Sequence, residues 1–354
     1  MSTHKIKHLV LSGGGLLGIS YIGLIKYFEE QNTLSNIESI TGCSAGAIFG
    51  SLLSIGYTYK ELNVIVKSMI FKDYLKINVD SLLNFVNTKG FESGRNLNLF
   101  IKKSIKEKTG DENITFSQIQ EKYNIKLQIG VTNLTKSKFE LFNIDTTPDI
   151  SIINAISASI AIPFIFEPII IGDDIYCDGG LLDNLPIENI IENTVLQKNC
   201  DKIQDKIQDK IQDKIQDKIN DIEENKEIST GDLEKLNINK NDEDSVDTKE
   251  NSFTTIGFYL INKIPKINKD NYQIISISQY INVITHTLSE NFIYTKTKIE
   301  NNNKKYKIIK IEIPCDIMTF IKLNATHDDI DNIIDIAYNI TKNELNLVLP
   351  KTYI

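Results

Sequence analysis

The sequence predicts an α/β fold built around a mostly parallel central sheet. Two short apolar strands, at residues 6–12 and 37–41, each run into a glycine-rich turn and then into an apolar helix. Successive strand–turn–helix units of this kind place their strands parallel, so that both turns lie at the same edge of the sheet. Ligands bind at that edge in open α/β sheets, and we therefore expect the functional residues there.

The first unit occupies residues 6–30. Its strand alternates and then becomes continuously apolar, its helix at 19–30 is amphipathic, and Gly13-Gly14-Gly15-Leu16-Leu17-Gly18 lies between them. A dinucleotide-binding turn has a similar pattern, but it requires an acidic residue at the end of the second strand, whereas Glu38 precedes that strand. We therefore expect the backbone N–H groups of the first three glycines to form an oxyanion hole.

The second unit contains a candidate nucleophile, Ser44, within Gly42-Cys43-Ser44-Ala45-Gly46. The backbone of a Gly-x-Ser-x-Gly turn is pressed tightly around the serine, so both flanking glycines are needed for lack of bulk. The hydroxyl then stands at a helix N-terminus, where N–H groups and the helix dipole favour developing negative charge. Because ordinary glycine-rich turns can match this short pattern by chance, the rest of the chain has to support the assignment.

The middle of the chain supplies further helices, a strand pair and a hairpin. We predict helices at 60–75, 80–86, 95–108 and 149–159, paired strands at 126–133 and 139–143, and a hairpin of 169–171 with 175–177. Asp178-Gly179-Gly180 follows the hairpin and holds a carboxylate on a turn, although aspartate is also common in ordinary turns. Asn184-Leu185-Pro186 then begins a helix that extends to residue 191.

An acidic low-complexity insertion is predicted at residues 198–251. Within it, residues 201–220 repeat Asp-Lys-Ile-Gln and end with Asp-Lys-Ile-Asn. Isoleucine at every fourth position drifts by about 40° per repeat around a helix, so the stripe cannot lie flat on a core. We expect the insertion to be disordered or a loose helix within a single domain at 6–345. The fold continues at 253–345, with strands at 254–261 and 306–313 and helices at 279–300 and 327–339.

Composition excludes several classes of protein. The net charge is −8, and the insertion accounts for most of it, so no basic face for nucleic acid is present. Four cysteines and four histidines show neither disulfide-framework nor metal-ligand spacing, which favours a reduced intracellular protein without a metal site. The apolar stretches 9–28 and 151–171 are interrupted by glycines or prolines, so we expect no signal peptide and no transmembrane helix. Apolar residues at 69–75 are interpreted as core and not as a lipid-facing patch.

Together, three motifs carry a family resemblance: the glycine run at 13–18, the serine turn at 42–46 and Asp178-Gly179-Gly180. In this order they resemble the patatin-like phospholipase family, and the linking segment Ala158-Ser159-Ile160-Ala161-Ile162-Pro163 is similar too. The likeness covers residues 6–195 well and 253–345 more loosely.

The resemblance implies a three-layer α/β/α fold and hydrolysis of lipid acyl esters at a membrane or droplet surface, without a cofactor. It implies Ser44 as nucleophile, Asp178 as base and the backbone of Gly13, Gly14 and Gly15 as the oxyanion hole. The glycines that support these turns are Gly18, Gly42, Gly46, Gly179 and Gly180. One departure is Leu17, where many members carry a basic residue, and this weakens an assumed contact with an anionic head group.

Two alternatives stay open at this point. The order Ser44, Asp178 and then His286 or His327 matches an α/β-hydrolase triad, but that fold needs more strands before its serine turn. The second alternative is a catalytically inactive lipid-binding protein, and the intact serine, aspartate and glycines argue against it.

Overall fold

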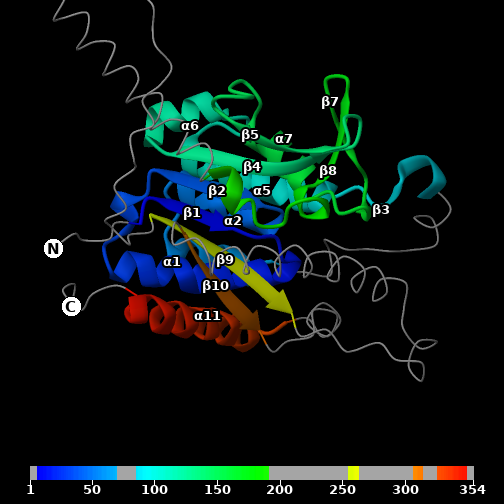
Figure 1. Cartoon of the computed structure of the whole chain (residues 1–354). Helices are drawn as coiled ribbons and strands as arrows, with labels where there is room; N and C mark the ends of the chain where they lie inside the picture. The colour runs from blue at the N-terminus through cyan, green and yellow to red at the C-terminus, as the bar shows by residue number, and fades with distance from the viewer. Residues whose placement is uncertain (1–5, 70–84, 191–253, 263–305, 314–324, 349–354) are drawn as a thin grey trace, which may run out of the picture. The chain divides into compact units, whose positions relative to one another are not determined.

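The structure is a computed structural model that describes residues 6–69, 85–190, 254–262, 306–313 and 325–348 (Figure 1). The central sheet belongs to the first of two compact units, which comprises residues 1–187 and 252–354, and residues 188–251 form the second. The predicted insertion at 198–251 and the predicted helix at 279–300 lie outside the described residues. Of the predicted helix at 80–86, only residues 85 and 86 are described.

A mostly parallel sheet forms the centre of this unit, as predicted. Its strands lie in the order β10-β9-β1-β2-β4-β8-β7, and β5 also pairs with β4. The strands from β10 to β4 are mutually parallel, whereas β5 and β8 run antiparallel to β4 and β7 runs antiparallel to β8. Their bounds are β1 His8–Leu11, β2 Ser39–Cys43, β4 Lys126–Asn133, β5 Lys138–Asn143, β7 Ile169–Ile171, β8 Asp174–Asp178, β9 Thr255–Asn262 and β10 Tyr306–Ile313.

Helices flank the sheet, which gives the three-layer α/β/α arrangement (Figure 1). Helix α1 packs against α11, which lies below β10 in Figure 1. Gly23 permits this close approach, because a Cβ there would lie 2.1 Å from the carbonyl oxygen of Ile334. None of the described helices is long and apolar enough to cross a bilayer. The helices are α1 Tyr21–Glu30, α2 Ala45–Ser54, α3 Tyr59–Lys67, α5 Arg95–Thr109, α6 Phe116–Tyr123, α7 Ile152–Ser159 and α11 His327–Val348.

Several boundaries differ from the sequence-based expectation. The first helix begins earlier, as a 3₁₀ segment at Gly15–Ser20, because the glycine turn tightens before α1 starts. A short parallel pair, β3 (Gly90–Glu92) with β6 (Phe164–Phe166), was not predicted, since three residues are too few to establish a period. Helix α3 ends at Lys67, earlier than the predicted end at residue 75. In the apolar stretch at 69–75, Met69 packs against the core, and residues 70–75 lie outside the described residues.

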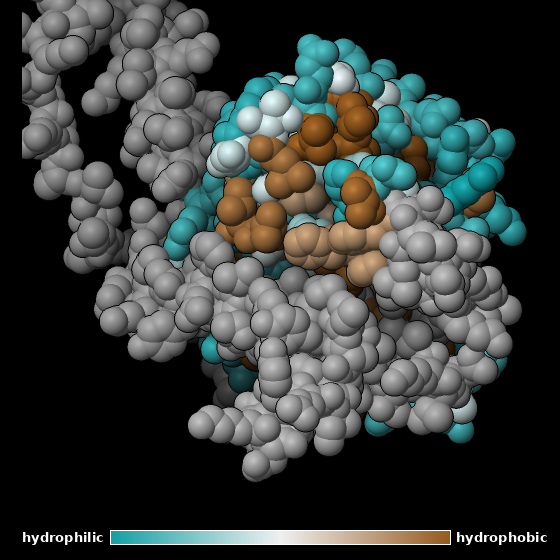
Figure 2. Space-filling model, turned by 90° about the vertical axis from the view of Figure 1, so that its right-hand side faces the viewer, coloured by the Kyte–Doolittle hydropathy of each residue, from teal (hydrophilic) through white to brown (hydrophobic). Residues whose placement is uncertain are grey.

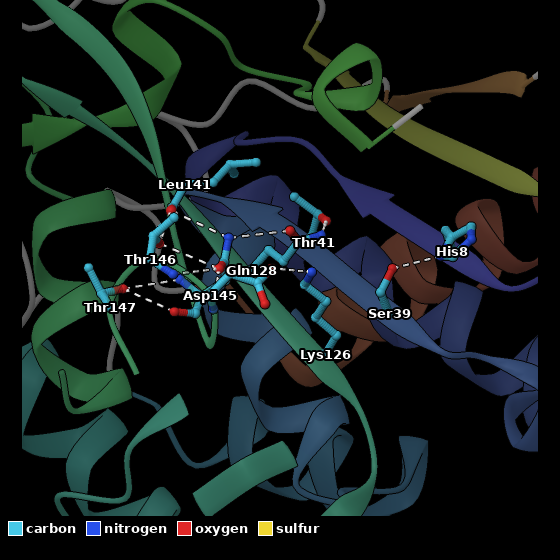
Figure 3. A network of polar contacts seen from close by, with 10 residues as sticks. His8, Ser39, Thr41, Lys126, Gln128, Leu141, Asp145, Thr146 and Thr147 are labelled. Carbon is cyan, nitrogen blue, oxygen red and sulfur yellow. Dashed lines mark hydrogen bonds and ion pairs between the residues drawn. The ribbon is translucent and has the colours of Figure 1, made fainter. Parts of the chain in front are cut away.

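A buried polar network joins strands β2, β4 and β5 (Figure 3). The side-chain amide of Gln128 donates to Thr41 Oγ1 at 3.0 Å, and Asn143 Nδ2 donates to Gln128 Oε1 at 3.4 Å. Asn143 Oδ1 in turn accepts the backbone N–H groups of Asp145 and Thr146. Because these groups satisfy one another, the network sets the register of the β4–β5 pair and leaves no buried polar atom here for a ligand.

Candidate active site

Ser44 occupies the sharp turn between β2 and α2, and its backbone is in the left-handed region, with φ 53° and ψ −119°. A non-glycine residue is rare in this region, and the conformation costs on the order of 1–3 kcal/mol. At the positions of the two flanking glycines, Gly42 and Gly46, there is no space for a side chain. A Cβ on Gly42 would lie 2.2 Å from the carbonyl oxygen of Gly46, and one on Gly46 would lie 2.2 Å from that of Leu11.

Asp178 is the last residue of β8, and the pairing of β4 explains its position. Strand β2 pairs with β4 only as far as Cys43 opposite Gly130, and β8 pairs with β4 from Val131 onward. Strand β5 pairs with residues on both sides of that junction, so it occupies the other edge of β4. Strands β2 and β8 therefore meet end to end on one edge of β4, which brings Ser44 and Asp178 together.

The two side chains form a direct hydrogen bond. Ser44 Oγ donates to Asp178 Oδ2 at 2.6 Å, and the N–H of Gly180 donates to Oδ1 at 2.7 Å. Both residues are buried. Burial raises the pKa of Asp178 to about 6, although the hydrogen bonds from Ser44 and Gly180 act in the opposite direction. A carboxylate with this pKa is a considerably better proton acceptor than a solvated aspartate and is still ionised at neutral pH.

Ser159, at the end of α7, holds the backbone of the serine turn. The N–H of Ser44 donates to Ser159 Oγ at 2.8 Å, and the Ser159 hydroxyl donates to the carbonyl of Gly130 at 2.7 Å. Ser159 is fully buried. The α7–β8 connection also supports the base, because the N–H of Asp178 donates to the carbonyl of Ala161 at 2.9 Å.

The glycine run passes directly beside the serine, since a Cβ on Gly13 would lie 2.9 Å from Ser44 Cβ. The predicted role of Gly13 needs correction. Its N–H donates to Asn184 Oδ1 at 3.0 Å and is not free to bind an oxyanion. In the described part of the chain, Gly14 and Gly15 donate no backbone hydrogen bond, and Gly15 has φ 55° and is exposed. The candidate oxyanion donors are thereby reduced to two.

The remaining motif glycines sit where backbone or side chains approach closely. A Cβ on Gly18 would lie 2.8 Å from Ala45 Cβ, and one on Gly179 would lie 2.5 Å from the carbonyl oxygen of Gly130. A Cβ on Gly180 would lie 2.8 Å from Asn184 Oδ1, the same oxygen that binds Gly13.

Among the described residues, no histidine lies between Ser44 and Asp178, because the two side chains touch directly. His327 is at the exposed start of α11, where its Nε2 lies 3.2 Å from the carbonyl oxygen of Lys67, and His8 Nδ1 lies 2.8 Å from Ser39 Oγ. The triad alternative would need His286, which lies outside the described residues.

A family model of patatin-like phospholipases matches residues 9–191, which include the glycine run, the serine turn and Asp178. The chain belongs to the patatin-like phospholipase family.

Two viral relatives are each 34% identical to this family member over 188 residues. Uncharacterized protein R571 of Acanthamoeba polyphaga mimivirus is matched over 53% of this chain and 62% of its own length. The relative named "Probable lipid hydrolase 463L", of Invertebrate iridescent virus 6, is matched over 52% of this chain and 63% of its own. The chain thus spans less than two thirds of either relative. Among solved structures, VipD from Legionella pneumophila has a TM-score of 0.46 at 16% identity, covering 97% of this chain and 67% of VipD.

Two residues of this patatin-like site were missed by the sequence reasoning. The sequence assigns no role in the site to Ser159, which lies within the segment at 158–163 that resembles the family, and it predicts Asn184 only as the start of a helix. The structure shows that each links segments distant in sequence, since Asn184 accepts the Gly13 N–H and also donates to the Gly13 carbonyl at 3.4 Å. A polar side chain beside a helix end gives no sequence signal for such a long-range partner.

A groove of about 420 Å³ lies away from this site. It includes Ile37 and Ile40 near the start of β2 and Ile125 directly before β4, so it is at the opposite end of these strands from Ser44. It contains none of the motif residues and makes no contribution to the candidate chemistry.

Proposed function

We propose that this protein hydrolyses acyl esters of lipids, using Ser44 as nucleophile and Asp178 as the sole general base. The observation that carries the proposal is the 2.6 Å hydrogen bond from Ser44 Oγ to Asp178 Oδ2 at a strained turn that begins a helix. Family membership and the name of the iridescent virus relative support the lipid substrate class.

In the first half-reaction, Ser44 Oγ attacks the acyl carbonyl carbon while its proton passes to Asp178 Oδ2. The oxyanion of the tetrahedral intermediate accepts hydrogen bonds from the N–H groups of Gly14 and Gly15, assisted by the positive end of the α2 dipole. When the intermediate collapses, the alcohol leaves with the proton from Asp178, and the acyl group remains on Ser44.

In the second half-reaction, Asp178 takes a proton from water as the water oxygen attacks the acyl carbon. When this second tetrahedral intermediate collapses, the bond to Ser44 Oγ breaks, Asp178 returns the proton to Ser44 Oγ, and the fatty acid is released. Burial assists both steps, because a desolvated carboxylate is a stronger base than a solvated one. The hydrogen bond from Gly180 keeps the second carboxylate oxygen occupied, so that Oδ2 faces Ser44.

Labelling with a fluorophosphonate probe tests the proposal, because such a probe reacts only with an activated serine. We expect covalent labelling of the wild-type protein, and no labelling of Ser44→Ala or of Asp178→Asn. Ser157→Ala is the control. It removes a serine hydroxyl of α7 that bonds to Asn98 and Ile153 and not to Ser44, so this variant should label normally. Absence of labelling in the folded wild-type protein would favour an inactive lipid-binding protein.

The histidine variants separate the dyad from a triad. We expect His327→Ala and His286→Ala to keep most of their esterase activity on a soluble ester. A loss of several hundredfold in either folded variant would replace the proposed dyad with a triad.

A further inference from the structure

Large apolar side chains are exposed on the segments that lead to the candidate site. Phe164 is 55% exposed, Ile170 is 71% exposed and Ile175 is 40% exposed. Exposed apolar side chains that cluster on one face typically mark an interaction surface. We name two groups of side chains together the apolar rim: the aromatic group of Phe85, Phe91 and Phe164 with the exposed Val86, and the aliphatic pair Ile170 and Ile175.

The aromatic part of the rim is assembled from two distant segments. The ring centroids of Phe85 and Phe91 are 4.5 Å apart in a stacked arrangement, and those of Phe85 and Phe164 are 6.3 Å apart. Phe164 has φ 69°, in the left-handed region where a bulky side chain is a marked outlier. An exposed phenylalanine on a strained backbone stabilises the fold poorly, which points to a function at the surface.

The aliphatic part is a cross-strand pair on the β7–β8 hairpin. Ile170 lies directly opposite Ile175 in the antiparallel register, and both are exposed. The neighbours Ile169 and Ile171 are partly buried against the core, because successive side chains of a strand point to opposite faces. Within the described part of the chain, no residue covers Ile170.

The rim is connected to the candidate site through short covalent links. Ile175 lies three residues before Asp178 in β8, and Phe164 lies three residues after Ala161, whose carbonyl accepts the Asp178 N–H. Figure 2 views the side toward which the arrowhead of β9 points in Figure 1, and hydrophobic surface gathers on it. Strand β9 is parallel to β1 and β2, so their carboxyl ends, and with them the glycine run and Ser44, point to the same side.

The charges within the rim segments select the kind of lipid. Residues 85–95 and 164–175 contain two basic residues, Lys89 and Arg95, against four acidic ones, Glu92, Glu167, Asp173 and Asp174, and Asp174 is neutralised by an ion pair with Lys136. Anionic membranes attract clusters of basic residues, and these segments contain no such cluster. Insertion of apolar side chains into an uncharged interface depends on buried apolar area and needs no basic cluster.

We propose that the apolar rim docks the protein on the surface of a zwitterionic phospholipid bilayer. The inference rests on the proposed function, since docking places ester bonds of the lipid next to Ser44. Phe164 and Ile170 enter the interface from two separate parts of the rim, and each contributes independently to binding.

Flotation of the full chain with phosphatidylcholine vesicles tests this inference, in the Ser44→Ala background so that no lipid is consumed. We expect Phe164→Asp and Ile170→Asp each to weaken vesicle binding by roughly tenfold, the effect of withdrawing one large apolar side chain from the interface. Val64→Asp is the matched control. It changes an equally exposed aliphatic residue on α3, outside the rim, and should leave binding unchanged.

A second measurement separates docking from chemistry. With Ser44 intact, both rim variants should hydrolyse a monomeric short-chain ester as fast as the wild-type protein and lose activity only on vesicles. Binding by both rim variants within twofold of the parent would overturn the docking inference, even if ester hydrolysis is normal. Binding only to anionic vesicles, abolished at about 0.5 M salt, would overturn it too. Rim-dependent flotation of a protein that hydrolyses no ester would uphold docking and reject the proposed function.

Discussion

The two halves of the candidate site are held in place by different means. The serine half is local, because Gly42, Gly46 and the start of α2 force Ser44 into its conformation within five residues. The aspartate half is assembled at long range. Asp178 depends on its pairing with β4, on the carbonyl of Ala161 and on the Gly180 N–H. A nucleophile can thus be specified by a short motif, whereas its base requires the assembled sheet.

The largest expected effect on catalysis comes from removing the negative charge of Asp178, in the aspartate half of the site. Asp178→Asn keeps the shape but cannot accept the serine proton, so we expect kcat on a soluble ester to fall by roughly 10⁴-fold or more. Steady-state kinetics measure kcat, and circular dichroism checks that the variant is folded. A folded Asn variant with more than a hundredth of the wild-type kcat would contradict the assignment of Asp178 as base.

The same variant should be more stable than the wild-type protein. The pKa of Asp178 is about 6 in the fold against a reference of 3.8, so ionisation of this buried carboxyl costs up to about 3 kcal/mol at pH 7. Since the folded pKa is raised, this cost appears as pH rises from about 4 to 6. The difference in melting temperature between the Asn variant and the wild-type protein should therefore be largest at pH 7 and should shrink toward pH 4.

The next effect concerns the glycine run. Gly14→Ala would place a methyl group 2.8 Å from Leu260 Cδ1 and displace the loop, so we expect kcat to fall by roughly 10²–10³-fold, as for loss of an oxyanion donor. Gly15→Ala meets no atom within 4 Å and should cost less, mainly the left-handed strain at φ 55°. Equal, near-normal kcat in both variants would reject these N–H groups as donors.

Ser159 links the two halves, and its removal should have an intermediate effect. Ser159→Ala leaves the buried N–H of Ser44 without its acceptor, so we expect a loss of about 1–3 kcal/mol in unfolding free energy. We also expect a 10- to 100-fold lower kcat, because displacement of the nucleophile by about 1 Å is costly. Ser157→Ala, two residues earlier on α7, is the control and should change kcat less than threefold, with KM unchanged in both.

The pH dependence should reflect the buried base. Because the Asp178 carboxylate must be ionised to accept the proton, kcat/KM should be constant above pH 7 and fall about tenfold per unit below about pH 6. An imidazole base near pKa 6.5 would give a similar curve, so the profile has to be repeated in the histidine variants. A profile that stays flat down to pH 4 in the wild-type protein would contradict the buried environment of Asp178.

The smallest expected effect is on stability and comes from the backbone strain at Ser44, in the serine half of the site. Ser44→Gly and Ser44→Ala both remove the nucleophile, but only glycine adopts φ 53° without steric cost. We expect the Gly variant to be about 1 kcal/mol more stable than the Ala variant in urea denaturation. The reverse order would indicate that the serine turn is relaxed in solution.

Much of this architecture is already determined by the sequence. The strand–turn–helix units, the strand pair at 126–143 and the hairpin before Asp178 follow from apolar periodicity and from turn residues that act within a few positions. The nucleophile and the glycine turns are local in the same sense, because glycine is needed wherever backbone passes close by. Helix starts at Thr58 and Thr115 also carry a local signal, since each forms a capping box with the residue three positions later, although the helix after Thr115 was not among the predicted ones.

The tertiary structure alone decided which groups are free and how they titrate. The alignment of β2 and β8 on one edge of β4, the capture of the Gly13 N–H by Asn184 and the burial of Asp178 all arise from residues more than one hundred positions apart or from the whole packed core. No local pattern encodes such contacts, because hydrogen bonding and desolvation depend on which atoms surround a group in space. For the same reason, the sequence suggested Asp178 as a base, but its raised pKa required the fold.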